Sequence, residues 1–223
     1  MKVDVPYHGN PGNACALACY TMVAQHLLPN EGITYEALAE VAGWKPGYVV
    51  WPAPVWAWLL ERGVSIIDYD VIDYEAWATE GLDGLRRSVP PEEYSYYEQH
   101  TYDLAGEGER MRAVLDNERL TYVRRKLTWD DVTREHELPG IVDVVVNSSV
   151  LNGEQGVALH RVVLLGITST EVTFHDPNAD WSGASRTEPL SLFRDAFEAL
   201  DGPELARYSS PSDGTNGSMR SST

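Results

Sequence analysis

The segment 8–25, with the sequence HGNPGNACALACYTMVAQ, contains both cysteines of the chain, four residues apart. A turn rich in Gly, Pro and Asn precedes an apolar run, and this order predicts a buried helix over residues 14–28, capped by Asn13. Two cysteines at positions i and i+4 of one helix are poorly placed to bridge each other. Cys15 and Cys19 are therefore predicted to be free thiols.

The composition narrows the class of protein. The chain has 223 residues, of which 43% are hydrophobic, enough for one sizeable core or two small ones. Its formal net charge of -17 argues against nucleic acid and anionic membrane surfaces as partners. No apolar run approaches the roughly 18 residues of a membrane span, and the first residues lack the apolar centre of a signal peptide. Together with free thiols, these features predict a cytoplasmic protein.

The order of the predicted elements indicates the fold class. Periodic apolar residues predict further helices at 34–43, 54–63, 127–138 and 190–200, and one near 109–117. Apolar β-branched runs predict strands at 140–147, 158–167 and 171–177, and weaker alternation predicts one at 65–71. Helices followed by an antiparallel sheet are typical of an α+β protein. The polar, aperiodic residues 209–223 predict a disordered tail after a single domain, 1–208.

The position of Cys15 suits a nucleophile. It lies in the first turn of the predicted helix, where the partial positive charge of the helix N-terminus favours the thiolate. Cys19 lies one turn deeper, among apolar neighbours, and is predicted to belong to the core. The preceding turn can offer backbone N–H groups to a developing oxyanion.

A thiolate nucleophile needs a proton shuttle, and the shuttle needs an orienting acceptor. Alternation places His160 on the same strand face as Val162, and it places Asp176 on the inward face of the following strand. Each residue also has a structural interpretation, His160 as a satisfied core histidine and Asp176 as a turn residue before proline. His175 is predicted to face outward and is a weak candidate for the base.

Five stretches of the chain share the order of one family: ACALACYTMV, IVDVVVN, LHRVVLLGI, VTFHDPN and LSLFRDAF. This order resembles the papain-like cysteine peptidases of the bacteriocin-processing, double-glycine-leader type. The resemblance covers residues 5–28 and 139–198. It is poor over about 66–126, and this segment is interpreted as an insertion that varies within the family. It implies a papain-like α+β fold, with Cys15 on a central helix and His160 and Asp176 on the sheet as a catalytic triad.

Two positions depart from the pattern of that family. Ala16 replaces the glycine that usually follows the nucleophile, and Gly9 stands where a glutamine usually donates to the oxyanion. Asn10 is the candidate replacement donor, and His8 is a second option. Asn10 has an equally good interpretation as a turn residue.

Other features have a functional and a structural interpretation. Trp51, Trp56 and Trp58 suit a substrate groove or a helix core, and the stretch YSYYEQHTY at 94–102 suits a lid or an exposed loop. The basic run 124–126 suits an anionic substrate or a solvated loop. A zinc site built from Cys15, Cys19, His160 and Asp176 is disfavoured by the helical spacing of the cysteines. No phosphate-binding glycine loop is present, so no cofactor or metal is predicted.

The sequence therefore predicts a cysteine-dependent hydrolase that acts on a peptide or small amide through a thioester acyl-enzyme. Two alternatives stay open. One is an acyl or peptidyl transferase that uses the same triad, and the other is a catalytically silent binding protein of this fold. The substrate and the oligomeric state are not specified by the sequence.

Overall fold

The computed structural model describes residues 3–11, 14–178 and 183–210. Its helices are α1 (Cys15–Leu27), α2 (Tyr35–Val41), α3 (Ala53–Glu61), α4 (Tyr74–Glu80), α5 (Leu82–Ser88), α6 (Pro91–His100), α7 (Leu104–Leu115), α8 (Trp129–Glu137), α9 (Ser148–Leu151) and α10 (Leu190–Glu198). Its strands are β1 (Ser65–Asp70), β2 (Leu120–Arg124), β3 (Ile141–Asn147), β4 (Leu159–Ile167), β5 (Glu171–His175), β6 (Arg186–Pro189) and β7 (Leu205–Ser209).

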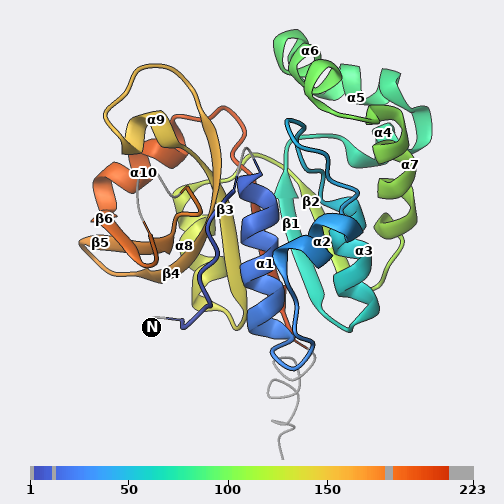
Figure 1. Ribbon diagram of the computed structural model, residues 1–223. Coiled ribbons are helices and arrows are strands. Elements are labelled where there is room, and N and C mark those ends of the chain that lie inside the picture. The colour runs from blue at the N-terminus through green and yellow to red at the C-terminus, as the bar shows by residue number, and fades with distance from the viewer. Residues whose placement is uncertain (1–2, 12–13, 179–182, 211–223) are drawn as a thin grey trace, which may run out of the picture.

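These strands form one seven-stranded sheet in the order β2-β1-β7-β3-β4-β5-β6. The β1–β2 pair is parallel and every other pair is antiparallel. The last strand in the sequence, β7, lies between β1 and β3 and joins the two parts of the sheet. In Figure 1, α1 stands upright near the centre, with β3 to β6 on one side of it and β1 and β2 on the other.

Both faces of the sheet are covered, and alternate residues of the strands belong to different cores. Val163 and Leu165 of β4 belong to the core that contains α1, whereas Val162 and Leu164 belong to the core that contains Phe193 of α10. A strand that is buried on both faces carries apolar residues at successive positions rather than at every second one. This explains the continuous apolar runs of β3 and β4.

The α+β class predicted from the sequence is confirmed, with Cys15 on α1 and an antiparallel arrangement of β3, β4 and β5. Element limits differ by one or two residues at most of the predicted ends. Helix α1 begins at Cys15, and its cap position is Ala14, which makes no capping hydrogen bond through a side chain. The predicted cap, Asn13, lies outside the described residues.

The segment 66–126 contributes more to the structure than the sequence predicts. It holds most of β1 and all of β2, so it supplies one edge of the sheet, and it forms α4 to α7 (Figure 1). The periodicity of apolar residues is hard to recognise here, because each helix is short and the next one follows almost directly. The break between α4 and α5 occurs at Gly81, whose φ of 66° suits a residue without a side chain.

Strands β6 and β7 were not predicted. The predicted tail begins at Ser209, but this residue ends β7, and residues 211–223 lie outside the described part of the chain. Within the described residues, none of the helices combines the length and the apolar character that a membrane span requires.

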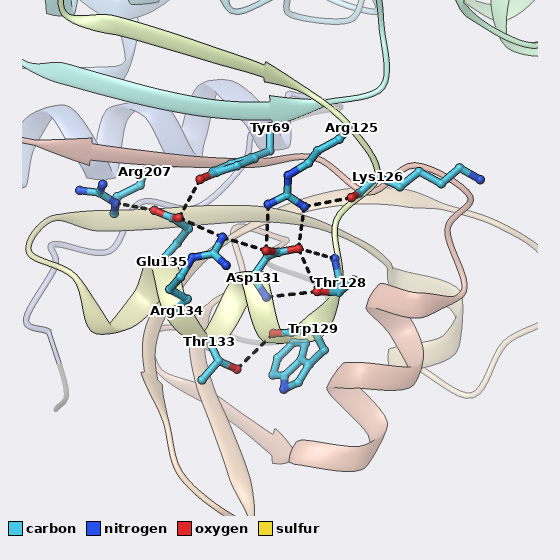
Figure 2. Close-up of polar contacts among 10 residues, drawn as sticks. All are labelled: Tyr69, Arg125, Lys126, Thr128, Trp129, Asp131, Thr133, Arg134, Glu135 and Arg207. Carbon is cyan, nitrogen blue, oxygen red and sulfur yellow. Dashed lines mark hydrogen bonds and ion pairs between the residues drawn. The ribbon is translucent and has the colours of Figure 1, made fainter.

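A network of ion pairs and hydrogen bonds between side chains holds α8 against the sheet (Figure 2). Arg125 donates from Nη1 and Nη2 to the two carboxylate oxygens of Asp131, each at 2.8 Å. Asp131 also closes a capping box with Thr128. Glu135 accepts from Tyr69 Oη at 2.7 Å and from Arg207 Nε at 2.9 Å. The basic run 124–126 is therefore engaged with carboxylates of this chain, since Arg124 pairs with Asp73 and Lys126 with Asp201.

Asparagine at position 131 is expected to destabilise the protein by about 1–2 kcal/mol at neutral pH, because it keeps the shape but removes the charge-assisted bonds. Hydrogen bonding from Arg125 and Thr128 holds the pKa of Asp131 far below its ordinary value. A depressed folded pKa gives stability that is present above the unfolded pKa, about 3.9, and is lost as the pH falls.

The difference in unfolding free energy between wild type and Asp131→Asn should therefore shrink below about pH 4. Urea titrations across pH measure it. Asp130→Asn, an exposed neighbour on the same turn, is the control and should change stability little. A difference that stays constant down to pH 2 would contradict the charge as its cause.

Candidate active site

Cys15 is the first residue of α1, where the N–H groups of a helix have no acceptor within the helix. Its side chain is partly buried and lines a cavity of about 350 Å³. His160, Asn10 and Arg161 line the same cavity. Cys15 is therefore both held in the fold and accessible to a small ligand.

His160 lies near the start of β4, between a carboxylate and the Cys15 thiol. Its Nε2 is 2.7 Å from Oδ1 of Asp176. His160 lines the same cavity as Cys15, and each of these two side chains shifts the pKa of the other. The structure thus brings Cys15, His160 and Asp176 together in the order thiol, imidazole, carboxylate.

Asp176 directly follows β5 and is fully buried. Its Oδ1 accepts from the backbone N–H of Asn178 at 2.9 Å in addition to His160. Its Oδ2 accepts from Nη1 of Arg186 at 3.0 Å. Both oxygens are therefore occupied by donors, and the carboxylate is fixed in position and in its ionised form.

The electrostatics favour a thiolate–imidazolium pair. Burial acts to raise the pKa of Cys15, but the hydrogen bond and charge of His160 and the N–H and charge of Arg161 outweigh it, so the pKa is lowered. Burial acts to lower the pKa of His160, but the bonds with Asp176 and Cys15 raise it to about 9. Burial likewise opposes ionisation of Asp176, yet His160, Asn178 and Arg186 bring its pKa below the ordinary value.

Cys19 differs from Cys15 in every respect that matters for reactivity. It is fully buried, as predicted, and its Sγ donates to the carbonyl of Arg161 at 3.3 Å. Burial and the charge of Asp143 raise its pKa well above the ordinary value. The two cysteines are free thiols, as the sequence predicts, with opposite ionisation tendencies.

Asn10 lines the cavity that contains Cys15, whereas His8 does not. Oδ1 of Asn10 accepts from the N–H of Ala14 at 3.2 Å, and its backbone N–H donates to the carbonyl of Pro177 at 2.5 Å. These bonds connect the segment before α1 to the loop after Asp176. His8 stacks on the ring of Tyr35 and does not line the cavity.

The prediction that His175 faces outward is wrong. Its side chain is buried, Nε2 lies 2.8 Å from the carbonyl of Val5, and Nδ1 accepts from the N–H of Ser185 at 3.0 Å. His175 does lie on the face of β5 opposite Phe174, as alternation of side chains along the strand predicts. That face, however, is covered by the N-terminal segment and not exposed to water. His175 is therefore a structural residue.

The aromatic stretches divide between core and cavity. Trp56 is buried in the core, as its structural interpretation required, whereas Trp51 lines the cavity and donates to Thr101 Oγ1 at 2.9 Å. The stretch 94–102 belongs largely to α6, which places Tyr96 and Tyr97 on the cavity wall. It is a wall of the site rather than an exposed loop.

Sequence reasoning missed Arg186. It bonds Asp176, and it also donates to Asn152 Oδ1 at 3.2 Å and to the carbonyl of Leu151 at 3.2 Å. Recognising β5 and β6 as a hairpin would have placed Arg186 opposite Phe174, close to Asp176. Among the described residues, no group of three His, Cys, Asp or Glu side chains could hold a metal ion.

Asparagine in place of Asp176 is expected to lower the pKa of His160 by about one unit or more, because an amide oxygen accepts the Nε2–H bond without supplying negative charge. An NMR titration of the imidazole protons measures this shift. The other histidines should titrate as in the wild type, and an unchanged His160 would show that the charge of Asp176 does not act on it.

No protein-family model matches this chain, and no curated protein matches it in sequence. Among solved structures, it is similar to the crystal structure of a double glycine motif protease from an AMS/PCAT transporter in complex with the leader peptide. The alignment has 12% sequence identity and a TM-score of 0.41, and it covers 93% of this chain and 92% of that chain.

Proposed function

We propose that this protein is a cysteine-dependent amide hydrolase, of the peptidase kind, with Cys15 as nucleophile, His160 as acid and base, and Asp176 as the orienting carboxylate. One observation carries the proposal: at the wall of a cavity, a single imidazole lies 2.7 Å from a buried carboxylate and lowers the pKa of a neighbouring thiol. Cysteine nucleophiles are activated in this way.

The first half of the reaction forms a thioester. The Cys15 thiolate attacks the amide carbonyl, a C–S bond forms, and the carbonyl electron pair moves to oxygen. The N–H groups at the start of α1 and the side-chain amide of Asn10 are the proposed donors to this oxyanion. The C–N bond then breaks, and the imidazolium of His160 gives its proton to the leaving amine.

The second half hydrolyses the thioester. Neutral His160 takes a proton from water, the resulting hydroxide attacks the thioester carbonyl, and the C–S bond breaks to release a carboxylic acid and regenerate the Cys15 thiolate. An amine in place of water would give a transferase. The high pKa of His160 supports the ion-pair form that begins each cycle.

Cys15→Ala is expected to abolish cleavage of a mixed peptide library, with a loss of at least about a thousandfold, because no other thiol reaches the cavity. Mass spectrometry of products formed in ¹⁸O-water identifies new carboxyl ends. Cys19→Ala, which removes the buried thiol, is the matched control and should retain cleavage.

Added hydroxylamine should divert a thioester to hydroxamates, and added amines show whether transfer competes with hydrolysis. Amine-dependent products without ¹⁸O incorporation would establish the transferase instead. No products under either condition, with a folded protein, would leave the binding protein as the correct alternative.

A further inference from the structure

The cavity beside Cys15 extends across three neighbouring strands. Arg161 on β4 stands opposite Val145 on β3, and the N–H of Val145 donates to the carbonyl of Glu204 at 2.9 Å. All three residues line the cavity. Glu204, just before β7, is therefore the carboxylate that the cavity contains together with Cys15.

Several carboxyl groups surround Glu204. Asp70, Asp143 and Glu204 act electrostatically on Asp68, and Glu204 also acts on Asp70 and Asp143. Arg161 donates to Asp143 Oδ1 at 2.6 Å and also bonds Glu204. Within residues 3–11, 14–178 and 183–210, no other lysine or arginine pairs with any of the four. Among the described residues, one guanidinium therefore pairs with two of these four carboxyl groups.

Two of these carboxyl groups lack a cation. Asp68 is 3% exposed, and its buried Oδ2 has no hydrogen-bond partner among the described residues. Asp70 accepts only neutral donors, the N–H groups of Val71 and Ile72 and the hydroxyl of Tyr74. Burial and the charge of Glu204 raise the pKa of Asp70 to about 8. A positive charge brought near Glu204 would relieve this unfavourable environment.

The rest of the cavity wall suits an organic cation better than a metal ion. Its aromatic residues are Tyr20, Trp51, Tyr74, Tyr96 and Tyr97, and its apolar residues include Val49, Val50 and Pro52. Aromatic faces attract ammonium and guanidinium groups, and apolar walls accommodate the methylene stem of a basic side chain. The guanidinium of Arg161 already lies 5.7 Å from the ring centre of Tyr20.

We propose that this cavity is a subsite for a basic side chain of the substrate, lysine or arginine, next to the bond that is cleaved, with Glu204 as its anionic partner. The inference rests on the proposed function and deepens it by naming a substrate class. It assigns Glu204 a role in specificity that is separate from the chemistry at Cys15.

The charge preference of the cavity can be measured without catalysis. A methanethiosulfonate reagent reacts with the Cys15 thiolate to form a mixed disulfide and release a sulfinate. We expect the trimethylammonioethyl reagent to modify Cys15 at least about tenfold faster than the sulfonatoethyl reagent, after division by the same ratio for 2-mercaptoethanol. Glu204→Gln, which keeps the shape and removes the charge, should lower this normalised ratio severalfold.

The negative net charge of the chain by itself favours a cationic reagent. The control variant must therefore change the net charge by the same amount as Glu204→Gln. Asp201→Asn does so at an exposed carboxylate and should leave the ratio near that of the wild type. The rates should be measured at about 0.15 M salt, because the Debye length is then about 8 Å and the effect of distant charges is largely screened. Equal normalised rates for the two reagents, or an equal loss in both variants, would overturn the subsite.

The substrate arm compares library peptides that carry lysine or Nε-acetyl-lysine beside the scissile bond. Wild type should prefer lysine by about tenfold in kcat/KM, and Glu204→Gln should reduce that preference. A cation preference at Cys15 with no cleavage of any peptide would refute the hydrolase and retain the subsite. Cleavage that is indifferent to lysine would retain the hydrolase and refute the subsite.

Discussion

Alanine in place of His160 is expected to reduce the rate at which iodoacetamide labels Cys15 at pH 6 by about tenfold or more. A cysteine with an ordinary pKa of about 8.5 is less than about 1% ionised at that pH, whereas His160 lowers the pKa of the wild-type thiol and so raises its thiolate fraction. Peptide mapping of the labelled protein across pH 5–9 measures the shift. The midpoint for Cys15 should move upward by one unit or more, because the lowering effect of His160 is lost while burial, which raises the pKa of the thiol, remains.

His26 gives a matched control for that experiment. It lies in the last turn of α1, at the end opposite Cys15, and bonds the carbonyl of Asp4. His26→Ala should leave the labelling profile of Cys15 unchanged. Cys19 should stay unlabelled in all the folded proteins, so equal labelling of the two cysteines would overturn the assignment of Cys15 as the activated thiol.

Replacing Arg161 by leucine is expected to lower the free energy of unfolding by about 3–5 kcal/mol, because it leaves the charge of Asp143 without its buried partner. Asp143 is fully buried, and Arg161 Nη1 is its cationic donor at 2.6 Å. Such a loss is a large part of the 5–15 kcal/mol typical of a domain. Urea titration followed by tryptophan fluorescence measures it.

Replacing both partners by uncharged residues distinguishes two causes of the lost stability, the unpaired charge of Asp143 and the lost packing of the Arg161 side chain. The double variant Arg161→Leu/Asp143→Asn should recover most of the stability, since position 143 then carries no charge that needs a partner. Arg194→Leu removes an exposed pair with Glu198 and should change stability by less than about 1 kcal/mol. An Arg161→Leu protein as stable as the Arg194 variant would show that the pair with Asp143 contributes little.

The sequence predicts those parts of the fold that repeat with a clear period or carry a marked chemistry. The helix that begins at Cys15 and the strands β3, β4 and β5 are of this kind, because apolar β-branched runs bounded by turns are specific to buried strands. Alternation along these strands also predicts that His160 and Asp176 share a face, and the two side chains lie 2.7 Å apart.

What the sequence did not predict depends on contacts between distant segments. The second face of the sheet is covered by residues near Val5, which a strand pattern cannot reveal, and the outward placement of His175 was wrong for that reason. Arg186 and Glu204 enter the site through β6 and β7, short strands defined by their neighbours more than by their own residues. The local pattern of apolar and polar residues does not predict such strands well.

The position of β7 also determines when the chain can finish folding. Residues 205–209 follow β1 and β3 along the chain, and they pair with β1 on one side and β3 on the other. During synthesis, both of those neighbours must wait with unpaired backbone edges until β7 leaves the ribosome, and exposed edges are where strands of other chains attach. A chain interrupted before residue 205 would therefore expose the edges of β1 and β3, and this intermediate would be prone to aggregation.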